Sequence, residues 1–114
     1  MINNTNNSYI GCTAENLNKL ILIHDVTLSP EKLLQKIKRL GIVRVEYVKV
    51  NGKNKKCWVI NEEAEWFGLN LSTGDGDETV PYFWDGRFPI ILEGVRQVMK
   101  KELTDYVNST RIFH

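Results

Sequence analysis

Residues 28–60 read LSPEKLLQKIKRLGIVRVEYVKVNGKNKKCWVI and hold the clearest local signals in the chain. Ser29 suits a helix N-cap, Pro30 suits the first helical position, and Gly41 suits the left-handed residue that ends a helix. Between them, apolar residues recur three and four positions apart, at Leu33, Leu34, Ile37 and Leu40. This spacing predicts a helix over residues 30–40 that buries one apolar face.

A β-hairpin is predicted directly after this helix, over residues 44–60. β-branched residues dominate Ile42–Val50, and Asn51-Gly52 is a favoured turn between antiparallel strands. We expect a polar, basic loop over residues 51–55 and a returning strand over Lys56–Ile60.

The elements around this central stretch are predicted from the same kinds of signal. Thr13 is expected to cap a first helix that runs to about His24. A short helix is predicted over residues 61–67, and residues 69–77 are predicted to form a loop, followed by an aromatic segment over residues 80–88. The longest helix is expected over residues 89–107, with an apolar stripe formed by Ile91, Leu92, Val95, Val98, Met99, Leu103 and Tyr106.

Length and composition narrow the class of protein. A chain of 114 residues supports one domain, which we expect over residues 9–114 after a disordered, Asn-rich polar tail over residues 1–8. Two cysteines and two histidines make neither a disulfide framework nor a His-based metal site. The sequence shows no signal peptide and no apolar run long enough to span a membrane, so a cytoplasmic location is expected.

The order of the predicted elements is helix, helix, hairpin and, after a short helix and an aromatic loop, a long final helix. We therefore predict an α+β fold, a winged helix-turn-helix with a two-stranded wing and a long C-terminal helix. In such a fold the second helix enters the major groove of DNA while its apolar side holds the core.

The charges divide along the chain. Residues 31–56 hold nine Lys or Arg and two Glu, whereas residues 57–114 hold five basic and ten acidic residues. We expect the positive charge to gather on one surface and the negative charge to collect elsewhere. The predicted nucleic-acid contacts are Lys32, Gln35, Lys36 and Arg39 of the helix and Lys53, Lys55 and Lys56 of the wing. The alternative interpretation of this helix is an ordinary solvated face, because Lys is a common surface residue.

Three segments also carry a family resemblance. The segments LSPEKLLQKIKRLGIV, KCWVINEEAEWFGLN and PYFWDGRFPIIL resemble the winged-helix module at the C-terminal end of phage antirepressors, the KilA-C type, and related phage DNA-binding proteins. The resemblance covers about residues 13–95. It implies a non-enzymatic, double-stranded DNA-binding regulatory protein of a phage or mobile element, acting in the host cell. Because the large N-terminal domain of an antirepressor is missing, it also implies a small stand-alone protein.

The same provenance leaves a second class of function open, an inhibitor that binds a host protein such as a defence nuclease or a repressor. Its contacts would be acidic side chains that imitate phosphates or cover a basic surface. The candidates are Asp75, Asp77, Glu78 and Asp85. The alternative interpretation of this region is a flexible solvated loop.

The remaining candidates favour structural roles. Most of the aromatic residues between Trp66 and Phe88 are expected in the core, with stacking on single-stranded nucleic acid as the alternative. His24 is expected to cap a helix or lie on the surface, and Cys57 to be an inert thiol. We expect no catalytic residues and no cofactor. The final helix, residues 89–107, packs either on its own domain or on a second copy in a homodimer.

Overall fold

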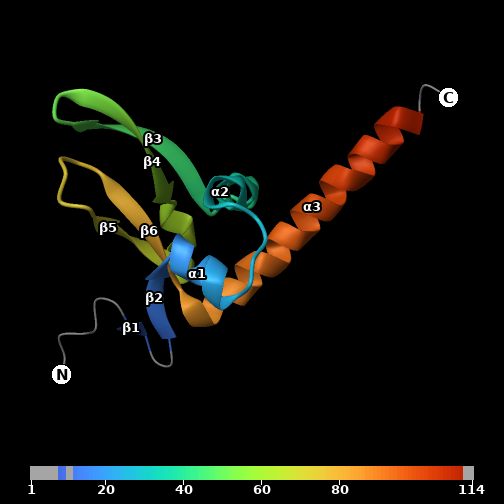
Figure 1. Ribbon diagram of the computed structural model, residues 1–114, viewed down its shortest axis with the longest axis horizontal. Coiled ribbons are helices and arrows are strands. Elements are labelled where there is room, and N and C mark those ends of the chain that lie inside the picture. The colour runs from blue at the N-terminus through green and yellow to red at the C-terminus, as the bar shows by residue number, and fades with distance from the viewer. Residues whose placement is uncertain (1–7, 10–11, 112–114) are drawn as a thin grey trace.

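The computed structural model describes residues 8–9 and 12–111 and shows an α+β fold (Figure 1). Of the polar tail expected over residues 1–8, only Ser8 lies in the described part, as the first residue of a short strand; residues 1–7 lie outside it. The elements, in chain order, are β1 (Ser8–Tyr9), β2 (Cys12–Asn16), α1 (Leu17–Ile23), α2 (Pro30–Arg39), β3 (Val43–Val50), β4 (Lys53–Ile60), the 3₁₀ helix η2 (Glu62–Phe67), β5 (Gly68–Ser72), β6 (Thr79–Trp84), the 3₁₀ turn η3 (Asp85–Arg87) and α3 (Phe88–Arg111).

The strands form two antiparallel units. One sheet has the order β1-β2-β6-β5, and β3 pairs with β4 in a separate hairpin. The side-chain amide of Asn70 joins the two units, because its Oδ1 accepts from the Ile60 N–H at 2.8 Å and its Nδ2 donates to the Ile60 carbonyl at 3.2 Å. At the start of β5, a Cβ on Gly68 would lie 2.1 Å from the Tyr82 carbonyl oxygen. Glycine therefore permits the close approach of β5 to β6.

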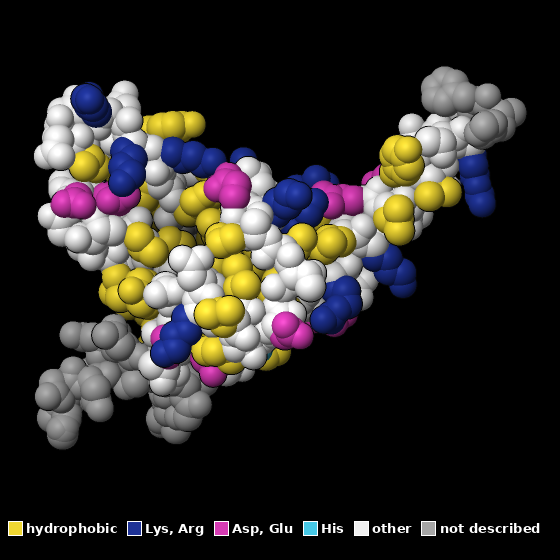
Figure 2. Space-filling view, in the orientation of Figure 1, with side chains coloured by type: hydrophobic (Ala, Val, Ile, Leu, Met, Phe, Trp, Pro, Cys, Tyr) yellow, Lys and Arg dark blue, Asp and Glu magenta, His cyan; other side chains and the backbone are white. Residues whose placement is uncertain are grey.

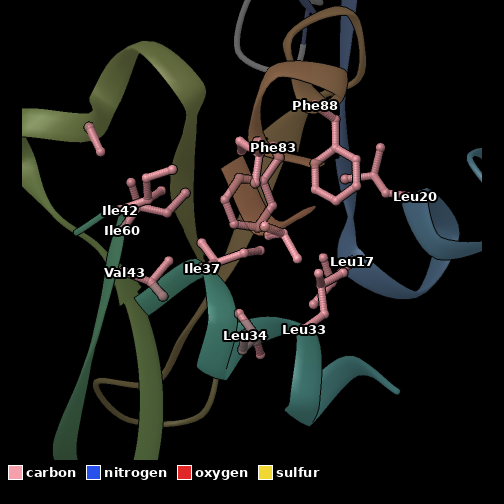
Figure 3. Packing of buried hydrophobic residues seen from close by; sticks show 13 residues of the cluster. Leu17, Leu20, Leu33, Leu34, Ile37, Ile42, Val43, Ile60, Phe83 and Phe88 are labelled. Carbon is pink, nitrogen blue, oxygen red and sulfur yellow. The ribbon is translucent and has the colours of Figure 1, made fainter. Parts of the chain in front are cut away.

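The core lies where α1, α2 and the first turns of α3 cover the end of the sheet. Leu20, Leu33, Ile37, Phe83 and Phe88 are fully buried there. Figure 3 shows the side chains from the helices converging on Phe83 and Phe88, whose ring centroids lie 5.8 Å apart. The apolar face predicted for residues 30–40 is confirmed, since Leu33, Leu34 and Ile37 are all buried.

Both predicted ends of α2 are confirmed. The Ser29 hydroxyl accepts from the Lys32 N–H at 3.3 Å, and Pro30 occupies the first turn. At the other end Gly41 takes a left-handed φ of 80°, which glycine adopts without strain. The chain therefore turns immediately from α2 into β3.

The hairpin is confirmed, but its loop is shorter than predicted. Val50 pairs with Lys53, so the turn is Asn51-Gly52 alone, with φ of 53° and 77°. These left-handed values are typical of a two-residue turn whose twist matches the strands. The returning strand therefore starts at Lys53 and not at Lys56.

Two sequence-based assignments were wrong. The segment from Thr13 is strand β2, and the cap of α1 is Asn16, whose side chain accepts from the Lys19 N–H at 2.9 Å. The segments predicted as a loop and an aromatic connection form the β5–β6 hairpin, with only the turn between Ser72 and Thr79 irregular. The errors have different causes: β2 pairs with the distant β6, whereas β5 and β6 are neighbours in the chain whose apolar and polar residues do not alternate cleanly.

The final helix is longer than residues 89–107. Helix α3 has 24 residues, and its last buried residue is Val95. Helix α3 packs on the body through its first turns, touches α2 again through Glu102, and beyond that projects away from the body (Figure 1). This projection gives the molecule its elongated dimensions of 62 × 40 × 25 Å.

We predict that Asn70→Ala destabilises the fold by about 1–3 kcal/mol, because it leaves the partly buried Ile60 N–H and carbonyl without their partners. Urea unfolding followed by circular dichroism measures the change. Asn54→Ala, on the exposed part of the β3–β4 hairpin, is the control and should leave the midpoint unchanged. Equal midpoints for the two variants would show that Asn70 does not join the two strand units.

Candidate functional site

The predicted nucleic-acid contacts lie along the concave edge between the hairpins and α3, but on two faces of the β3–β4 hairpin, because Lys56 points to Glu31 of α2 and its neighbour Lys55 points to Glu78 of the β5–β6 turn. In Figure 1 the two hairpins and the projecting part of α3 diverge from the body, with α2 between them. Helix α2 approaches α3 closely at its end, where Gly94 leaves room for the side chain of Leu40. Figure 2 shows Lys and Arg side chains along this edge, with carboxylates between them.

One flank of α2 faces α3 through an ion-pair network. Lys36 Nζ lies 2.6 Å from Glu102 Oε1, and Arg39 donates to Glu102 Oε2 at 3.1 Å. The Lys36 and Glu102 side chains are partly buried, whereas Arg39 is exposed. A single carboxylate of α3 thus holds two of the predicted DNA-contacting cations.

The other flank of α2 faces β4 through Glu31. Its carboxylate accepts from Lys56 at 2.9 Å, from Gln35 at 3.3 Å and from the Trp58 indole at 3.4 Å. Lys56 also lies over the Trp58 ring, 5.0 Å from its centroid. The hydrogen bond from Lys56 is the main reason that the pKa of Glu31 is below its ordinary value. Glu31 therefore ties the start of α2 to the hairpin.

The tip of the β3–β4 hairpin, which was predicted to be a wing, lies beside the acidic turn between β5 and β6. Lys55 Nζ is 2.7 Å from Glu78 Oε2, and the Asp77 N–H donates to the Lys49 carbonyl at 3.4 Å. The hydrogen bond between Lys55 and Glu78 lowers the pKa of the carboxyl and raises the pKa of the ammonium. Asp75 and Asp77 are exposed and have no ion-pair partner within residues 8–9 and 12–111.

The expected separation of charge between surfaces was wrong. Four of the six predicted cations pair with the protein's own Glu31, Glu78 or Glu102. The remaining two, Lys32 and Lys53, are exposed and have no ion-pair partner in the described chain. On the side of α2, Lys32, Lys36, Arg39 and Lys56 outnumber Glu31 and Glu102, so an excess of positive charge stays there. At the hairpin tip, Lys53 and Lys55 lie near Asp75, Asp77 and Glu78, and no such excess remains among these residues.

The candidate acidic residues do not form one surface. Asp85 lies at the far end of β6 from Glu78, about 20 Å away for an extended strand. Its carboxylate lies 2.7 Å from His24 Nε2, and the imidazole also packs against Phe88. Asp85 therefore belongs to the packing of the body, and only Asp75, Asp77 and Glu78 share the hairpin turn.

The other expected structural residues divide between core and surface. Phe83 and Phe88 are buried and unavailable for stacking, whereas Trp66 is half-exposed and lies under the Arg87 guanidinium, 4.0 Å from its ring centroid. Cys57 is buried, with its Sγ 3.0 Å from the Thr79 carbonyl oxygen, as expected for an inert thiol. His24 is the C-cap of α1, as expected.

The sequence did not predict that Glu31 and Glu102 would pair with the cations on and beside α2. Glu31 was treated only as a helix-start residue, and Glu102 gave no signal because it lies 66 residues from Lys36 in the chain. Lys38 and Lys49, both exposed, add positive charge that the predicted set omitted. Paired charges within one turn are visible in a sequence, whereas these contacts depend on how α2, α3 and the hairpins pack.

Among the described residues, no three His, Cys, Asp or Glu side chains gather in a way that could hold a metal ion. No helix in the same part of the chain is long and apolar enough to cross a membrane. The chain matches no protein-family model, no curated protein and no solved structure.

We predict that Lys55→Ala raises the pKa of Glu78 toward its ordinary value. The pair stabilises the fold above the unfolded-state pKa of the carboxyl, and this contribution is lost as the pH falls through the lower folded-state pKa. NMR titration of the side-chain carboxyl measures the change. Lys53→Ala removes a charge from the same hairpin without removing the hydrogen bond and should leave Glu78 unchanged; an equal shift in both variants would refute a specific pair.

Proposed function

We propose that the chain is a non-enzymatic, winged-helix regulatory protein that binds double-stranded DNA, of the phage or mobile-element type that its sequence resembles. In this proposal α2 enters the major groove and the β3–β4 hairpin is the wing. The observation that carries it is the excess of positive charge along α2 and at Lys56 of the adjoining hairpin. Such a protein would act in the cytoplasm of the host cell.

The order of elements supports this proposal. Helix α1 is followed by α2, whose apolar side is buried and whose opposite side is exposed. The hairpin begins directly after Gly41, so the wing and the exposed side of α2 are neighbours. A winged helix-turn-helix needs this proximity, because one duplex must contact both elements.

The internal ion pairs are compatible with DNA binding. Pairs between exposed side chains contribute about 0–1 kcal/mol, so a phosphate can replace the carboxylate at modest cost. Of the four predicted contacts that pair with a carboxylate, Arg39 is the most exposed, and its guanidinium can form two hydrogen bonds with guanine. Gln35 lies on the same exposed side and can pair with adenine once it leaves Glu31. Lys32 and Lys53 are placed for phosphates.

The first test removes the two cations that have no ion-pair partner in the described chain. We predict that Lys32→Ala with Lys53→Ala lowers affinity for duplex DNA by about ten- to a hundredfold and reduces the salt-dependence slope by about 2, because each phosphate contact releases counterions. Fluorescence anisotropy across a salt series measures both values.

The matched control is Lys19→Ala with Lys101→Ala, which removes the same charge from α1 and from the projecting part of α3. Both pairs of substitutions are at exposed positions and should leave the unfolding midpoint unchanged. A similar loss of affinity in the two double variants would show that DNA binding depends only on net charge, and this would contradict the proposed surface.

A second prediction concerns Glu102. Its carboxylate holds Lys36 and Arg39, so Glu102→Gln should free both cations and strengthen DNA binding by about three- to tenfold, as expected when one nearby negative charge is removed. Glu63→Gln makes the same change in charge at an exposed position of η2 and is the control. Weaker binding by Glu102→Gln than by the control would contradict a DNA contact on this flank.

A second candidate function is inhibition of a host protein, which the exposed turn between β5 and β6 favours. Asp75 and Asp77 have no ion-pair partner among the described residues, and they project beside the wing. Capture from host lysate with nuclease present would separate the two functions. A captured protein that is lost with Asp75→Asn and Asp77→Asn would favour the inhibitor, provided that these substitutions leave DNA affinity unchanged.

A further inference from the structure

The projecting part of α3 carries an apolar stripe that the body leaves uncovered. Met99, Leu103, Tyr106 and Val107 form this α3 stripe, with exposed fractions of 40%, 63%, 67% and 39%. Their spacing of four, three and one places them on one side of the helix, next to the side on which Ile91 and Val95 are buried. A stripe of this kind is typical of a helix that packs against another element.

A shallow groove lies beside the first half of the same helix. It has a volume of about 320 Å³ and lies between the α1–α2 connection, at Val26 and Leu28, and the α3 residues Leu92, Val95 and Met99. Met99 belongs both to this groove and to the α3 stripe. The groove and the stripe therefore form one continuous surface along α3, which is apolar apart from His24, Asp25, Thr27 and Arg96 at the groove.

We propose that this surface binds a second copy of the chain, with the two α3 helices antiparallel about a two-fold axis near Leu103. The projecting half of each helix then lies against the groove of the other copy. A second copy fits because a two-fold interface must be self-complementary, and α3 supplies both the groove and the stripe that fills it. In this register Leu103 lies near its symmetry mate and Met99 lies opposite Tyr106 of the other copy.

The charges beside the stripe favour the antiparallel direction. Glu93 and Arg111 are about five turns apart, so they lie on the same side of α3. They are also equally distant from residue 102, so the two-fold axis brings Arg111 of each copy to Glu93 of the other. Glu93 already accepts from Arg96 and from Gln97, and a carboxylate has acceptor sites for a further guanidinium. A parallel pair would keep these charges five turns apart and leave both grooves empty.

The other side of the stripe is occupied by the chain's own α2. Glu102 lies there with its carboxylate on Lys36 and Arg39, so each copy brings a compensated charge to the interface. The proposal does not depend on DNA binding, because it rests on α3 and the α1–α2 connection. Failure of dimerisation and failure of DNA binding would thus be seen separately.

The oligomeric state of the purified chain tests the interface. We expect a dimer by light scattering and analytical ultracentrifugation. Leu103→Glu should raise the dissociation constant of the dimer by about a thousandfold, since both copies lose a central contact. Asn108→Glu adds the same charge on the far side of the projecting helix and should leave the dimer intact. A monomeric wild-type chain in the millimolar range, or equal effects of the two variants, would overturn the interface.

Exchanging the charges of Glu93 and Arg111 tests whether the two α3 helices are antiparallel. Glu93→Arg and Arg111→Glu should each weaken the dimer about tenfold, and the double variant should recover most of the wild-type affinity. Circular dichroism establishes that each variant keeps its helical content. Retained dimerisation by both single variants, or a double variant weaker than either, would overturn the antiparallel register.

Discussion

The burial of one side of α2 against Phe83 and Phe88 is the constraint on which the rest of the structure depends. Leu33 and Ile37 contribute the helix side of this contact and are completely enclosed. Each fully buried side chain of this size contributes about 1.5–3 kcal/mol relative to exposure. Because α2 is fixed in this orientation, its polar side must face outward, and Gly41 then directs the hairpin away from the body.

The same packing decides how the charges are distributed. Once α2 lies between α3 and β4, Lys36 and Arg39 reach Glu102 on one side, and Glu31 reaches Lys56 on the other. The basic segment of the sequence therefore becomes a mixed surface on which cations outnumber carboxylates. In the proposed function, phosphate groups of DNA would replace these carboxylates as partners of the cations.

The sequence predicted the elements whose signals are local and failed where the signal was distant. Ser29, Pro30 and Gly41 mark the ends of α2 through backbone chemistry within a few residues, and Asn51-Gly52 marks the hairpin in the same way. Strands β5 and β6 were missed because their aromatic and polar residues do not alternate cleanly. The ion pairs of Glu102 could not be predicted from the sequence, since nothing in residues 98–106 indicates that α2 packs against this part of α3.

Gly68 and Asn70 have a consequence for recognising related chains. Gly68 admits no side chain because the Tyr82 carbonyl occupies the space, and Asn70 bonds to main-chain atoms rather than to a variable side chain. Both requirements come from the backbone, so they do not depend on the surface charges or on the binding partner. We therefore expect a chain that shares this architecture to carry a glycine and an asparagine two positions apart, after a β-hairpin and a short acidic turn.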